Sequence, residues 1–261
     1  MPILQGPNFV QKKIRNLLTL FGSFGIVGSH TVNTNYNKMR TKALLGLAAL
    51  AVSAVTCVAQ SNVYSLNIVG YVNVDVAPGL NLIANPLKPS NGNYNITNTI
   101  SLPETADGAF IYKWAGTAWS SQIPSWIAGF GWSPDLEIPH GEGFFLQLPQ
   151  AAGNIKVLFV GEVSTGNVQQ DIPAGLSVKA NEIPVQENWP GSAVGNDGDS
   201  IYTWSGSAWD TAIWSYIAGF GWSNGGAAGD NVNGPLLKVG GAVMYQNTGA
   251  ALSWTRAFNP Q

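Results

Sequence analysis

The sequence is poor in cysteine, histidine and charged side chains. Its one cysteine is Cys57, so the residues that follow it have no disulfide, no thiol nucleophile and no thiolate metal ligand. His140 is the one histidine after position 60, and we expect it to lie in a loop. No G-x-S-x-G, H-E-x-x-H or phosphate-loop motif occurs. The absence of these signatures predicts a protein without cofactors and without enzymatic activity.

The few charges are also unevenly distributed. Residues 1–59 hold six of the twelve Lys and Arg and none of the fourteen acidic residues. The remainder therefore carries six basic and fourteen acidic side chains, a formal net charge of −8. Nucleic acids and anionic membrane surfaces attract clustered Lys and Arg. The acidic body argues against both as partners.

No apolar run after residue 60 has the length of a membrane span, and the apolar run that precedes residue 60 is too short for one. Residues 43–55 form an apolar run of 13, whereas a transmembrane helix needs about 20. The run follows the basic segment 39–42 and precedes small residues, which is the pattern of a secretory signal. We predict a signal peptide over residues 39–59, cleaved before Gln60, and a disordered upstream extension over residues 1–38. The predicted location is the periplasm, the cell surface or the medium.

What the chain does contain is an internal repeat. Residues 111–133 and 201–223 are identical at 15 of 23 positions. Similar segments flank both copies, and β-branched and aromatic residues alternate between Gly and Pro turns, with no helical period. We predict an all-β fold: two similar antiparallel β-sandwich or barrel-like repeats in tandem, over residues 60–157 and 158–261. In this alignment residues 69–72 match residues 160–163, and the last strand matches residue 155 onward.

All ten tryptophans lie in the predicted repeats. Those at equivalent strand positions are expected to fill the core, because large aromatic side chains dominate small β cores: Trp114, Trp132, Trp204 and Trp222. A second group lies near turns, where exposed indole rings can stack on sugar rings. These are the candidate sugar-binding residues: Trp119, Trp126, Trp209 and Trp214.

Two groups of carboxylates are candidate sites of other kinds. Asp135, Glu137 and Glu142 cluster in the first repeat, and two carboxyl groups about 5–10 Å apart can act as a glycosidase pair. Solvated loop acids are the simpler interpretation. Asp197 and Asp199 have an alternating spacing that Ca²⁺ could use, which makes them a weak calcium candidate.

Several segments together resemble a known group of proteins. The succession of residues 69–87 (VGYVNVDVAPGLNLIANPL), GWSP, HGEGFFLQ and the final WTRAF resembles exported bacterial β-proteins. Proteins of that group carry a secretory leader and tandem copies of such segments. The resemblance implies export and a tandem β fold, and it implies no catalytic residues.

These observations favour a non-enzymatic exported β-repeat protein with a structural, adhesive, cell-surface or matrix role. The alternative is a carbohydrate-binding module that uses the near-turn tryptophans. A weaker alternative is a glycoside hydrolase that uses the acids at 135–142. The expected partners are an extracellular polysaccharide or an envelope protein, with self-association through exposed strand edges as a further possibility.

Overall fold

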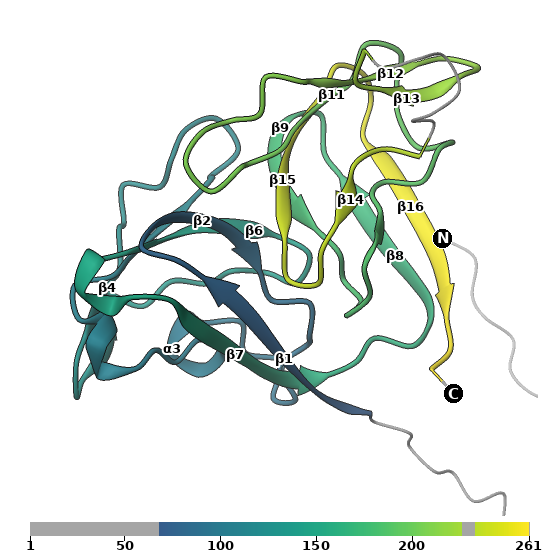
Figure 1. Ribbon diagram of the computed structural model, residues 1–261. Coiled ribbons are helices and arrows are strands. Elements are labelled where there is room, and N and C mark those ends of the chain that lie inside the picture. The colour runs from purple at the N-terminus through teal and green to yellow at the C-terminus, as the bar shows by residue number, and fades with distance from the viewer. Residues whose placement is uncertain (1–67, 226–232, 261) are drawn as a thin grey trace, which may run out of the picture. The chain divides into compact units, whose positions relative to one another are not determined.

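Antiparallel strands dominate the part of the chain that the computed structural model describes, residues 68–225 and 233–260 (Figure 1). They form two five-stranded sheets and three two-stranded pairs. The described helical elements are single turns. The predicted all-β fold is confirmed. The predicted extension and signal peptide lie outside the described residues.

The first half of the fold combines a two-stranded ribbon with a five-stranded sheet. The ribbon pairs β1 (Val69–Val76) with β7 (Ile155–Glu162) along their whole length. The sheet has the order β2-β6-β3-β4-β5. Its strands are β2 (Gly79–Ala84), β3 (Phe110–Lys113), β4 (Ser125–Ile127), β5 (Gly131–Ser133) and β6 (Gly143–Leu148). The connections carry the short helix α3 (Ile96–Thr99) and the 3-10 turns η2 (Glu104–Ala106) and η3 (Gln150–Ala152).

The second half repeats this arrangement. Its ribbon pairs β8 (Gly166–Ile172) with β16 (Leu252–Phe258). Its sheet has the order β9-β15-β11-β12-β13. The strands are β9 (Gly175–Ala180), β11 (Ser200–Tyr202), β12 (Trp214–Ile217), β13 (Gly221–Ser223) and β15 (Ala242–Asn247). A small extra pair joins β10 (Glu187–Asn188) to β14 (Leu236–Leu237).

The two sheets agree in register as well as in order. Ala84 faces Gly143 in the first sheet, and Ala180 faces Ala242 in the second. Residues at the same register position of the two sheets are therefore equivalent. The pairing of β1 with β7 also corrects the predicted match of residues 69–72 with residues 160–163. Residues 160–162 belong to β7, which is the partner of β1, and the strand of the second half that corresponds to β1 is β8. The predicted boundary between residues 157 and 158 falls inside β7.

Strand alternation divides the apolar side chains among three clusters. On β2, Ile83 faces the core between the first sheet and its ribbon, while Leu82 and Ala84 face the opposite side. The second sheet and its ribbon enclose an equivalent core that contains Trp222 and Tyr245. The third cluster lies where the two sheets pack against each other: Leu82, Ala84, Phe145, Val178, Ala180 and Ala242.

The contact between the two halves is reciprocal. The Ala84 amide donates to the Gly240 carbonyl at 2.9 Å, and the equivalent Ala180 amide donates to the Gly141 carbonyl at 3.0 Å. By their contacts, all the described residues belong to one compact unit. Each half therefore presents the same edge of its sheet to the other.

Candidate functional site

Each five-stranded sheet carries a tight hairpin that holds a pair of tryptophans. In the first half, Trp114 and Trp119 bridge the hairpin, and their rings meet edge to face with centroids 5.3 Å apart. Gly116 occupies the turn with a φ of 94°, a conformation that favours glycine. Trp204 and Trp209 form the same pair in the second half, 5.2 Å apart.

The two tryptophan pairs meet on a single phenylalanine. The ring centroid of Phe145, on β6, lies 5.6 Å from that of Trp119 and 5.8 Å from that of Trp209. The Trp204 ring packs on Phe145 at 5.1 Å. Side chains that are ninety positions apart in the sequence are thus brought to one place by the packing of the sheets.

Indole hydrogen bonds fix the inner tryptophan of each pair. Trp114 Nε1 donates to the Leu176 carbonyl across the contact between the halves, and Trp204 Nε1 donates to the Leu80 carbonyl, both at 2.9 Å. Leu80 and Leu176 are equivalent residues. Because each inner indole is anchored to the opposite half, the outer indoles of Trp119 and Trp209 rest on a rigid base.

The outer indoles border a cleft of about 290 Å³, which we call the aromatic cleft. Its lining is Leu80, Tyr112, Trp119, Phe145, Gln147, Trp204 and Trp209, and none of these carries a charge. Trp119 and Trp209 are 40% and 36% exposed. The Tyr112 hydroxyl donates to Gln147 Oε1 at 2.6 Å. The Gln147 amide nitrogen has no partner among the described residues and remains available as a donor.

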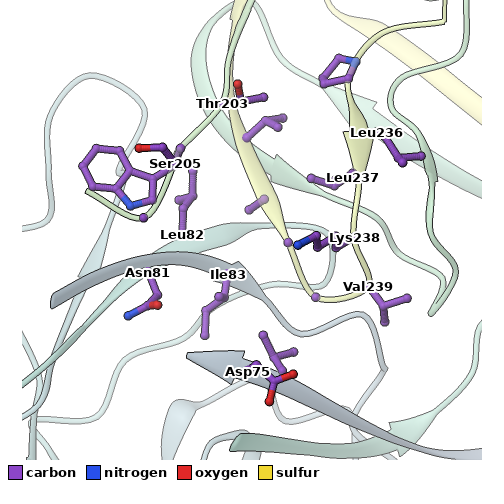
Figure 2. Close-up of a pocket in the computed structure, with 18 of the residues that line it drawn as sticks. Asp75, Asn81, Leu82, Ile83, Thr203, Ser205, Leu236, Leu237, Lys238 and Val239 are labelled. Carbon is purple, nitrogen blue, oxygen red and sulfur yellow. The ribbon is translucent and has the colours of Figure 1, made fainter. Parts of the chain in front are cut away.

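A larger depression, the large groove, runs along the edge of β2 that faces the second half and has a volume of about 620 Å³. Figure 2 shows Thr203 and Ser205 on one side of it, Leu236 to Val239 on the other, and Ile83 and Asp75 nearby. Trp204 lines both the large groove and the aromatic cleft. The two depressions therefore share a wall.

The four candidate sugar-binding tryptophans do not share one site. Trp119 and Trp209 meet at the aromatic cleft. Trp214 lines the large groove and packs against the second core. Trp126 packs against the first core and the ring of Trp132, with centroids 5.5 Å apart, and its indole nitrogen is buried. Trp126 is thus placed as a core-facing side chain.

The tryptophans expected in the core fall into two classes. Trp132 and Trp222 are buried in the two cores. Trp114 and Trp204 are partly buried and pack against the cluster between the sheets. The sequence did not single out Phe145 or Gln147 as site residues. The alternation of Phe145 and Gln147 on one face of β6 was the available signal.

Two carboxylates of the hydrolase alternative, those of Asp135 and Glu142, have different partners. Asp135 accepts hydrogen bonds from the Thr97 amide and hydroxyl, at 3.3 and 2.9 Å, and so holds the α3 segment. Glu142 forms an ion pair with Lys113 at 3.2 Å. The backbone carbonyl of Glu137 accepts a hydrogen bond from the Lys113 ammonium at 2.9 Å. The structure assigns Asp135 and Glu142 local stabilising contacts.

The calcium candidates Asp197 and Asp199 also have protein partners. The Asp197 carboxylate accepts from the Ala218 amide at 3.0 Å. Asp199 is fully buried, and its two oxygens accept four hydrogen bonds, from Asn196 N, Tyr245 OH, Thr248 N and Thr248 Oγ1. Within residues 68–225 and 233–260, no group of three or more His, Cys, Asp or Glu side chains is placed to hold a metal ion.

His140 lies in the loop between β5 and β6, as expected, but its side chain is buried against the other half. Its Nδ1 atom is 3.8 Å from Glu182 Oε2. Burial is the main reason that the pKa of His140 falls to about 4, with Lys88 adding to the effect and a hydrogen bond to the Pro86 backbone opposing it. The imidazole is therefore neutral near pH 7. Burial also raises the pKa of Glu182.

Comparison with protein-family models, with curated proteins and with solved structures finds no match to this chain. Among the described residues, no helix is long and apolar enough to cross a membrane.

Proposed function

We propose that this protein binds carbohydrate without catalysing its conversion, and that the aromatic cleft is the binding site. The observation that supports the proposal is the meeting of Trp119 and Trp209 on Phe145, with both indoles partly exposed at one uncharged cleft. Ligand sites are commonly apolar and aromatic, with a few polar groups that orient the ligand. The apolar C–H face of a pyranose ring matches an indole ring, and the Gln147 amide can donate to a sugar hydroxyl.

The lining also favours one class of sugar. No Lys or Arg borders the aromatic cleft, so a carboxylate or sulfate group on the ligand would lose its hydration without gaining a charged partner. The proposed ligand is therefore a neutral glycan. With the predicted signal peptide, its source would be outside the cytoplasm, in an envelope or matrix polysaccharide.

The test is binding of the purified chain to neutral glycans. Insoluble cellulose and chitin would be used in pull-downs, and soluble β-glucan and xylan in calorimetry. Trp119→Ala and Trp209→Ala should each weaken binding by about 2 kcal/mol, roughly thirtyfold, as for central aromatic residues of other interfaces. Phe130→Ala is the matched control, because Phe130 is 90% exposed and does not line the cleft.

Near-UV circular dichroism and the unfolding midpoint would establish that each variant is folded. Binding that survives both tryptophan substitutions would contradict the proposed site. The absence of binding to any of these glycans would contradict the proposed function.

A second candidate function, a structural or adhesive role, has its own supporting observation. The β4–β5 and β12–β13 hairpins present exposed apolar side chains at equivalent positions: Ile127, Phe130, Ile217 and Phe220. Phe130 and Phe220 are 90% and 75% exposed. If these tips mediate self-association, sedimentation should show concentration-dependent oligomers that the double variant Phe130→Ser/Phe220→Ser lacks. A monomeric wild type at high concentration would contradict this role.

A further inference from the structure

The large groove has a counterpart in the other half of the fold. This small groove follows the edge of β9 that faces the first half. The large groove follows the same edge of the equivalent strand β2, which faces the second half. Its volume is about 330 Å³, against about 620 Å³ for the large groove. The same backbone arrangement thus produces two depressions of different size.

Side chains at equivalent positions contribute to the difference, together with residues 73–75 and 235–240, which border the large groove alone. Lys113 and Glu142 line the small groove, and their ion pair, at 3.2 Å, occupies its space. The register of the sheets makes Thr203 the counterpart of Lys113 and Gly241 the counterpart of Glu142, and both line the large groove. A short side chain and a glycine leave open the space that an ion pair fills in the other half.

Polar groups suited to sugar hydroxyls line the open groove. Asp210 accepts a hydrogen bond from the Thr203 hydroxyl through one carboxylate oxygen, which leaves the other as an acceptor. Asn73 and Lys238 are exposed donors with no side-chain partner among the described residues. Trp214 contributes an aromatic ring to the same lining. The groove therefore offers acceptors, donors and an apolar surface together.

Trp204 connects this groove to the aromatic cleft, because it lines both. We propose that the large groove is an extension subsite of the aromatic cleft, so that the ligand is a chain of several neutral sugar units. One unit would lie on Trp119 and Trp209, and the following units would pass Trp204 into the large groove. This inference depends on the proposed carbohydrate-binding function.

The test is the dependence of affinity on ligand length. Calorimetry would compare cello-oligosaccharides and chito-oligosaccharides from the monosaccharide to the hexasaccharide. The affinity of the wild type should rise at least roughly tenfold over this series. The variant Thr203→Lys/Gly241→Glu copies the ion pair of the small groove into the large one. It should lose that gain and keep the affinity for the shortest ligand that binds.

The chain supplies a reciprocal control. Lys113→Thr/Glu142→Gly opens the small groove, which shares no lining residue with the aromatic cleft, and should leave the length dependence unchanged. Gly241 does not have a positive φ, but a Cβ there would lie 3.2 Å from the Lys238 carbonyl oxygen, so the glutamate requires a backbone shift of a few tenths of an ångström. If the double variant fails to fold, Asp210→Ala removes one exposed acceptor and should reduce the gain about threefold.

The outcomes separate the two proposals. Affinity that does not change with ligand length, or a gain that persists in folded Thr203→Lys/Gly241→Glu, would overturn the extension subsite and leave the cleft as the binding site. No binding by any member of the two series would overturn the proposed function itself.

Discussion

The buried carboxylate of Asp199 provides a stringent test of how the second half is stabilised. Substitution by asparagine keeps the size of the side chain and removes one of its two acceptor oxygens. In the folded protein each oxygen accepts two hydrogen bonds: Asn196 N and Tyr245 OH at 2.7 Å on one, and Thr248 N at 2.7 Å and Thr248 Oγ1 at 2.9 Å on the other. Burial, and then the bond to Asp199, raise the pKa of Tyr245, so the phenol remains a donor.

The size of the effect follows from this count. In Asp199→Asn, one pair of donors faces an amide NH₂ group in place of an oxygen. An unsatisfied buried donor costs about 1–3 kcal/mol. Each pair contains one backbone N–H, which is left unsatisfied, and one hydroxyl, which can turn and accept a hydrogen bond from the new amide. The Thr248 hydroxyl also lies 3.2 Å from a second acceptor, the carbonyl oxygen of Asp197. We expect the free energy of unfolding to fall by about 2 kcal/mol.

Urea unfolding followed by tryptophan fluorescence would measure the loss. Asp197→Asn is the matched control: it makes the same chemical change two positions away, at an exposed carboxylate with one hydrogen bond that an amide oxygen can still accept. Its effect should remain within about 0.5 kcal/mol. A loss below about 1 kcal/mol in Asp199→Asn, or an equal loss in both variants, would refute the reasoning.

Three further predictions concern the contact between the halves. Lowering the pH from 7 to 5 should destabilise the wild type relative to His140→Gln by about 2 kcal/mol, because the unfolded histidine takes up a proton near its ordinary pKa of 6.5, whereas the folded one does so only at about 4. Gly143→Val should lower the free energy of unfolding by more than about 2 kcal/mol, because a side chain there overlaps that of Ala242. Trp204→Phe should lower it by about 1–3 kcal/mol, since the Leu80 carbonyl loses its donor.

Urea titrations check all three, and each has a specific contradicting result. For the pH prediction, Glu182 titrates in both proteins, so a wild-type advantage that is equal at the two pH values would contradict it. Gly191→Ala is the control for Gly143, since a Cβ at Gly191 comes no closer than 3.4 Å to any neighbour. Trp114→Phe should match Trp204→Phe, and a large difference between these two variants would show that the two bonds are not equivalent.

The sequence was sufficient for the strands and insufficient for the cleft. Alternating apolar residues between Gly and Pro turns identify strands, because alternation is a local property of the sequence. The meeting of Trp119 and Trp209 on Phe145 depends on which faces of two sheets pack together, and alternation within a strand does not specify that. Asp199 illustrates the same limit. Its spacing from Asp197 resembles a cation site, and only the buried donors around it reveal its structural role.

The reciprocal contacts described above have the form of an isologous interface, the kind that joins the two subunits of a C2 dimer. Here both partners belong to one chain, connected between β7 and β8 by three residues that span at most about 11 Å. In a homodimer, any substitution appears on both sides of the symmetry axis at once. Within a single chain each side can change alone. Phe145 has Met244 as its counterpart in the other half, and the Lys113–Glu142 ion pair has Thr203 and Gly241 as its counterparts. The covalent join thus allows an almost symmetric scaffold to hold an asymmetric pair of grooves.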